Sequence, residues 1–92
     1  MKPLIDDIRS LEEKHLIAIM LYLNINPRCK KIEIYENVSS NPRIPDKLNR
    51  LESMGLITQQ DDSESRSIII ALTDKGADVA EKLAELDRII RC

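Results

Sequence analysis

The sequence contains no tryptophan or phenylalanine and only two tyrosines, so its core must be built from aliphatic side chains. Its two glycines, Gly55 and Gly76, are too few for a glycine-rich phosphate-binding loop. One histidine and two cysteines, Cys29 and Cys92, provide too few ligands for a structural zinc site, and we expect two reduced thiols. No Ser/His/Asp or Cys/His nucleophile arrangement is recognisable. We therefore expect no enzymatic activity, no bound metal and no cofactor.

Long apolar runs are also missing, because none approaches roughly 18 residues, the length of a membrane-spanning helix. The first ten residues, MKPLIDDIRS, lack the apolar stretch and the cleavage site of a signal peptide. We therefore expect a cytoplasmic protein without a membrane partner. The 92 residues fit a single small domain, and a domain of this size is often marginally stable alone.

The charges are unevenly distributed, although the net charge is only −2. Residues 28–50 hold six bases and three acids, whereas residues 61–92 hold eight acids and five bases. Such asymmetry can mark a surface that faces nucleic acid, but a difference this small also arises by chance.

Two helices are predicted in the first part of the chain. Ser10 and Glu13 form a capping-box pattern, which predicts a helix over residues 11–24 that ends before Pro27. Residues 30–38, KKIEIYENV, fit either a strand or a short helix. We favour the helix because a turn and a further helix follow it.

A third helix is predicted over residues 41–54. Ser40 or Asn41 can cap it, and Pro42 sits at or near its first position. Its apolar face is marked by Ile44, Leu48 and Leu51. Gly55 suits the position just beyond its end.

A β-hairpin and a last helix complete the predicted elements. LITQQ and SIIIAL are rich in β-forming residues, and the hexapeptide DDSESR between them fits the loop of a hairpin over residues 56–72. Thr73 can cap a helix over residues 74–91. This helix carries a coiled-coil-like apolar stripe formed by Val79, Leu83, Leu86 and Ile90.

This order of elements is that of a winged helix-turn-helix module. RLESMGLI (50–57) resembles the segment that ends the recognition helix in MarR-like and related small prokaryotic winged-helix regulators. LTDKG (72–76) resembles the segment that joins the wing to the final helix in the same proteins. The resemblance spans about residues 11–90. It implies a mainly α fold with a small hairpin (α+β), and a transcriptional regulator that binds double-stranded DNA in a sequence-specific way.

By this resemblance, the N-terminal half of the third helix enters the major groove. Arg43 and Lys47 are predicted to contact bases or phosphates, and Asp46 either accepts from a cytosine amine or pairs with Arg50. The predicted DNA-contacting residues are Lys30, Lys31, Ser40, Asn41, Arg43, Asp46, Lys47, Arg50, Ser65 and Arg66. Each charge taken singly is equally typical of a solvated helix face.

The predicted wing raises a difficulty, because Asp61, Asp62 and Glu64 oppose phosphates. Three alternatives remain open. The carboxylates face outward while Ser65 and Arg66 touch the DNA backbone, or the wing stays off the DNA altogether. In the third alternative the domain is a winged-helix protein–protein interaction module, a scaffold or assembly subunit that does not bind DNA.

Helix-turn-helix regulators commonly bind two half-sites as two-fold dimers, so we expect a homodimer. The segment over residues 1–10 and the last helix supply apolar side chains beyond what one small core needs. The predicted interface comprises Leu4, Ile5, Ile8, Val79, Leu83, Leu86 and Ile90. The alternative is that both terminal segments fold back on the core of one chain.

Overall fold

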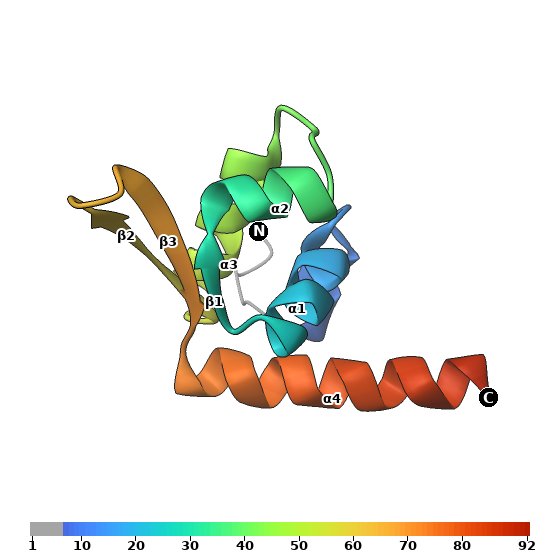
Figure 1. Ribbon diagram of the computed structural model, residues 1–92. Coiled ribbons are helices and arrows are strands. Elements are labelled where there is room, and N and C mark those ends of the chain that lie inside the picture. Colours follow the sequence, from blue (N-terminus) through green and yellow to red (C-terminus); the bar gives the residue numbers. More distant parts are fainter. Residues whose placement is uncertain (1–6) are drawn as a thin grey trace, which may run out of the picture.

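Helices form most of the chain, and a small antiparallel sheet flanks them (Figure 1). The computed structural model describes residues 7–92. The elements are η1 (Ile8–Glu12), α1 (Leu16–Ile25), β1 (Arg28–Lys30), α2 (Lys31–Asn37), α3 (Ile44–Ser53), β2 (Ile57–Asp62), β3 (Ser67–Leu72) and α4 (Asp74–Arg91). This order is the α+β winged-helix arrangement that the sequence predicts, with β2 and β3 as the wing.

The core is aliphatic, as the scarcity of aromatic residues requires. Its fully buried large side chains are Leu16, Ile19, Met20, Leu23, Ile34, Ile44, Leu48, Leu51, Ile57 and Ile70. They come from the first three α-helices and from the inner face of the wing. Helix α4 packs against α1, and its C-terminal half extends beyond the rest of the domain (Figure 1).

Strand β1 is an element that the sequence does not indicate. It joins the outer edge of β3, pairing Arg28 with Ala71 and Lys30 with Ile69, so that the sheet has the order β1-β3-β2. The pairing residues are far apart in sequence, and a three-residue strand has no visible periodicity of its own. Helix α2 follows from Lys31, which confirms the helix that we favoured for most of residues 30–38.

The predicted start of the first helix is wrong. Ser10 lies inside the short 3-10 helix η1, and Glu13 is the residue that ends it. Asp7 caps η1 instead, accepting from the backbone N–H of Arg9 at 2.9 Å. Helix α1 begins only after His15, which has a left-handed backbone with φ of 74°. Ser10 and Glu13 contact α3 instead, so long-range partners replace the predicted local cap.

Helix α3 begins at Ile44, three residues later than predicted, and neither Ser40 nor Asn41 is its N-cap. The side-chain oxygen of Asn41 accepts from the backbone N–H of Arg43 at 2.8 Å, which closes a turn ahead of the helix. Pro45 rather than Pro42 then occupies the first helical turn, where a missing N–H costs little. Helix α3 ends at Ser53, with Met54 as its C-cap. Gly55 follows with a left-handed φ of 78°, so it takes the position just beyond the helix that the sequence predicts.

The wing loop is shorter than predicted, because β2 continues to Asp62. Only four residues, 63–66, connect the strands. The backbone N–H of Arg66 donates to the carbonyl of Asp62 at 2.8 Å, and Arg66 takes a positive φ of 57°. Asp61 and Asp62 therefore belong to a paired strand and not to the loop.

The end of α3, the wing and the start of α4 meet at one corner. The hydroxyl of Thr73 donates to the carbonyl of Gly55 at 2.6 Å and accepts from the N–H of Gly76 at 2.9 Å, so it caps α4 as predicted. The carbonyl of Leu56 accepts from the N–H of Thr73 at 3.1 Å. A Cβ atom on Gly76 would lie 1.8 Å from that same carbonyl oxygen. Gly76 is therefore required by the close approach of two backbones.

The two glycines at this corner are expected to differ in their sensitivity to alanine. Gly76→Ala should lower the free energy of unfolding by about 3 kcal/mol, because the added methyl group collides with backbone atoms. Gly55→Ala should lower it by about 1–2 kcal/mol, the cost of a left-handed alanine, since only the Lys75 side chain lies near. Urea unfolding followed by circular dichroism measures both. Equal stability of the two variants would contradict the proposed packing.

Candidate nucleic-acid interface

The exposed face of α3 is the first candidate surface. Ile44, Leu48 and Leu51 are fully buried, as predicted, and anchor the helix to the core. On the opposite side, Arg43, Asp46 and Asn49 are exposed. Arg43 is the N-cap residue, so its guanidinium is presented at the start of the helix together with the partial positive charge of the helix dipole.

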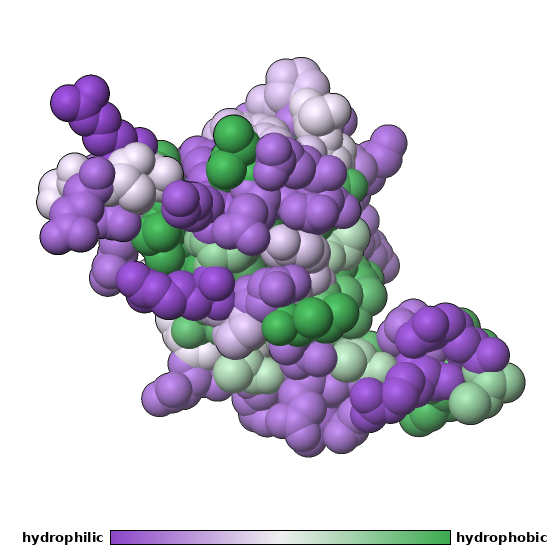
Figure 2. Space-filling view, viewed as in Figure 1, coloured by the Kyte–Doolittle hydropathy of each residue, from purple (hydrophilic) through white to green (hydrophobic). Residues whose placement is uncertain are grey.

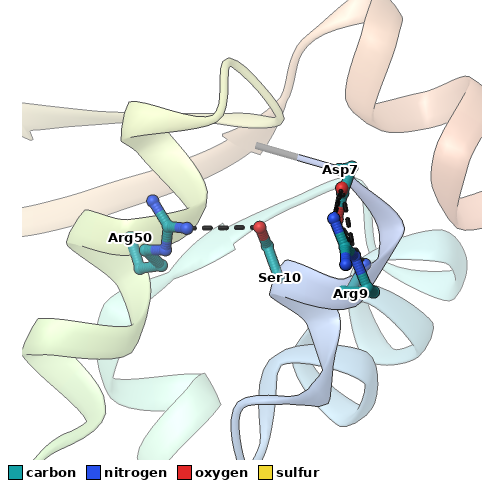
Figure 3. Close-up of polar contacts among 4 residues, drawn as sticks. All are labelled: Asp7, Arg9, Ser10 and Arg50. Carbon is teal, nitrogen blue, oxygen red and sulfur yellow. Dashed lines mark hydrogen bonds and ion pairs between the residues drawn. The ribbon is translucent and has the colours of Figure 1, made fainter. Parts of the chain in front are cut away.

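Two of the basic residues predicted to contact DNA from α3 do not lie free on its exposed side. The ammonium group of Lys47 lies 3.2 Å from a carboxylate oxygen of Glu13, and only 14% of the Lys47 side chain is exposed. Arg50 is half-buried, and its Nη2 donates to the hydroxyl of Ser10 at 3.2 Å (Figure 3). Both side chains thus contact the N-terminal part of the chain.

The turn before α3 brings Ser40 and Asn41 close to Arg43. The side-chain oxygen of Asn41 holds the turn, and the N–H of Asn41 donates to the Ser39 hydroxyl at 3.1 Å. Ser40 is exposed beside them. These two residues lie next to the helix start, where the sequence predicted phosphate contacts.

Lys30 and Lys31 lie at the junction between β1 and α2. Lys30 is exposed, and its backbone N–H donates to the Glu33 carboxylate at 2.8 Å, which caps α2. Lys31 is half-buried at the first position of that helix. A carboxylate therefore lies close to Lys30, which reduces the positive potential at this end of the surface.

One of the three wing carboxylates has a structural role. Asp62 accepts from the Ser65 hydroxyl at 2.8 Å and from the Glu64 N–H at 3.2 Å. These two bonds, the first being the stronger, lower the pKa of Asp62, and the charge of Lys30 contributes in the same direction. The Ser65 hydroxyl thus donates within the hairpin, to the last residue of β2. Asp61, Glu64 and Arg66 remain exposed around it.

A polar network that the sequence did not indicate joins α3 to the wing. The side-chain amide of Gln59 donates to Asn49 at 2.9 Å and to Glu52 at 3.1 Å. The backbone N–H of Gln59 donates to the second Glu52 oxygen at 3.1 Å. This network fixes the position of β2 relative to the exposed face of α3. Its members lie on two elements, so no spacing rule within one element would reveal it.

A second candidate surface is apolar and involves α4. Val79 and Leu83 are half-buried and line a groove of about 330 Å³ together with Ile8 and Leu11 of η1. Farther along the helix the side chains become exposed, with Leu86 at 50% and Ile90 at 79%. In Figure 2 the projecting end is mainly hydrophilic on the side in view, and apolar side chains appear at its edges. The predicted interface residues Leu4 and Ile5 lie outside the described residues.

The two cysteines differ in their surroundings, and neither forms a disulfide in the described part of the chain. Cys29 is buried in β1, and burial, together with the charge of Glu33, raises the pKa of its thiol to about 11. Cys92 is exposed at the end of α4.

No group of three metal-ligating side chains occurs within residues 7–92. Over the same range no helix has both the length and the apolar character to cross a bilayer.

The sequence matches no protein-family model. It is 30% identical over 86 residues to the organic hydroperoxide resistance transcriptional regulator of Bacillus subtilis (strain 168). The match covers 92% of the chain but 58% of the relative, so the chain spans rather more than half the length of that protein.

Solved structures of regulators share the fold. A transcriptional regulator homologue from Pyrococcus horikoshii OT3 superposes with a TM-score of 0.77 at 18% identity, over 92% of this chain and 88% of that one. Reduced AbfR, solved bound to DNA, superposes with a TM-score of 0.67 at 25% identity, over 84% of this chain and 62% of AbfR. The winged-helix fold expected from the resemblance is confirmed.

The thiols should differ strongly in reactivity. At pH 8, iodoacetamide should alkylate Cys92 more than about 100-fold faster than Cys29, because the thiolate is the reactive form and a pKa near 11 leaves Cys29 protonated. Peptide mass spectrometry over time measures both rates in one sample. Fast labelling of Cys29 in the folded Cys92→Ser variant would contradict the burial of this thiol.

Proposed function

We propose that this chain, which has the winged helix-turn-helix fold of MarR-like transcriptional regulators, is a regulator that binds double-stranded DNA as a homodimer. The observation that carries the proposal is the 30% identity to a transcriptional regulator over 86 residues, a stretch long enough to include the helices and the wing. The proposed activity is non-enzymatic and needs no cofactor. It takes place in the cytoplasm, where a prokaryotic regulator meets DNA.

Helix α3 is the element proposed to enter the major groove. Arg43 is exposed at its N-terminus, and a guanidinium matches the two acceptors on a guanine edge. Asp46 follows on the same exposed face and suits a cytosine amine. Asn49 continues this face, although Gln59 already donates to its side-chain oxygen. Base contacts are therefore assigned mainly to the first turns of α3.

Phosphate contacts are proposed for residues around this helix. Ser40 and Asn41 lie at its start, and Lys30, Lys31 and Arg66 lie on the neighbouring segments. On the wing, Arg66 is exposed beside Asp61 and Glu64. These acids repel the DNA backbone, so we propose that Arg66 makes a peripheral contact while the loop stays clear of the minor groove. The expected affinity therefore depends on few phosphates and falls only moderately with salt.

The homodimer is proposed to form through the projecting end of α4. Leu86, Ile89 and Ile90 are largely exposed there, and Ile8 is 73% exposed at the edge of the adjoining groove. Pairing two copies removes these side chains from water, which stabilises a domain too small to bury all its apolar surface. Two copies also present two α3 helices to successive half-sites.

DNA binding should depend on Arg43. The probe is a set of duplexes that the wild-type protein enriches from a randomised library, with binding measured by fluorescence anisotropy during a salt titration. Arg43→Ala should weaken binding by about tenfold or more, since a bidentate base contact contributes about 1–3 kcal/mol. Arg91→Ala, a matched loss of charge on the exposed end of α4, should leave binding nearly unchanged. Enrichment of no duplex at low salt would contradict the proposed function and leave the protein-interaction alternative.

The dimer should depend on the apolar end of α4. Ile90→Glu should convert the wild-type dimer to a monomer in sedimentation velocity, because it places a charge in the proposed apolar contact. The control is Ile32→Glu, which makes the same change at an exposed position on α2 and should leave the dimer intact. A wild-type protein that sediments as a monomer at about 100 μM would contradict the proposed interface.

A further inference from the structure

Two basic side chains of α3, those of Lys47 and Arg50, form polar contacts with the segment that precedes α1. Glu13, at the end of η1, forms the ion pair with Lys47, and the Ser10 hydroxyl accepts from Arg50 (Figure 3). Arg43, Lys47 and Arg50 recur along α3 at spacings of four and three, so they lie along one side of the helix. Of these three side chains, Arg43 is exposed, whereas Lys47 and Arg50 are partly buried. The contacts with η1 thus decide how many positive side chains α3 presents to a duplex.

We propose that η1 and Glu13 form an intramolecular clamp that withholds Lys47 from DNA and thereby limits affinity. The inference rests on the proposed DNA-binding function and concerns its regulation. Lys47 has a long flexible side chain, and release of its ammonium group from Glu13 lets it reach a backbone phosphate beside the groove-facing residues. One additional phosphate contact strengthens binding and makes it more sensitive to salt.

The clamp is built from an element that opens easily. Helix η1 has five residues in a 3-10 conformation, and Leu11 is its buried residue. Short 3-10 segments have weak internal hydrogen bonds, and segments with few buried contacts open locally at low cost. The segment ends next to His15, whose left-handed backbone sets the direction of the chain into α1.

The clamp also connects the two candidate surfaces. One side of η1 contacts α3 through Ser10, while Ile8 and Leu11 line the groove on α4. Any displacement of η1 that accompanies packing at α4 therefore changes the position of Glu13 relative to Lys47. Assembly at the apolar surface and affinity at the DNA-facing surface are coupled through one short segment.

The test compares two single substitutions that remove the same charge. Glu13→Gln breaks the ion pair with Lys47, whereas Glu12→Gln neutralises the exposed neighbouring residue and controls for the general loss of negative charge. On the duplexes enriched by the wild-type protein, Glu13→Gln should bind up to about tenfold more tightly than Glu12→Gln at about 0.1 M salt. Its slope of log affinity against log salt should steepen by about 0.9, the value for one further phosphate contact.

A double variant identifies the side chain that makes the new contact. Adding Lys47→Gln to Glu13→Gln should abolish both the gain in affinity and the steeper slope. Glu13→Gln that binds no more tightly than Glu12→Gln, while the wild type binds with salt dependence, overturns the clamp and leaves the proposed function intact. Weaker binding of Glu13→Gln overturns it as well, because Glu13 would then position Lys47 for DNA. Failure of every variant to bind DNA overturns both proposals.

Discussion

The backbone of Leu56 is the point on which the arrangement of the molecule depends. Its N–H closes the end of α3 against the carbonyl of Leu51, and its own carbonyl accepts from Thr73 at the start of α4. Gly76 lies so close that no side chain fits there. Helix α3, the wing and α4 are therefore set at fixed angles by backbone contacts, and the surfaces they carry keep a constant relation to one another.

The surface proposed to face DNA is less positive than the number of its basic residues suggests. Lys47 is paired with Glu13, Arg50 donates to Ser10, and Lys30 lies near the carboxylate of Asp62. Arg43 remains the prominent positive side chain of α3. A surface of this kind positions a helix through shape and a few directed contacts, and it gains less than a fully basic surface from counterion release.

The hydrogen bonds within the wing account for one of its acidic residues, Asp62. The carboxylate of Asp62 holds the four-residue turn together by accepting from Glu64 and Ser65, so it stabilises the hairpin. Asp61 faces solvent on a strand, and Arg66 occupies the left-handed position that closes the turn. The wing is thus a hairpin attached to α3 through Gln59, and its negative charge limits how deeply it can approach a phosphate backbone.

The sequence by itself determined the order of helices, the hairpin and α4, because the spacing of Leu48 and Leu51, the cap at Thr73 and the turn at Gly55 act within a few residues of the chain. It also indicated Arg43 at the exposed side of α3. Only the tertiary structure decided β1, the partners of Ser10 and Glu13, and the loss of Lys47 from the exposed face. Each of these depends on groups brought together from distant parts of the chain, where a long-range hydrogen bond or ion pair outweighs a local propensity.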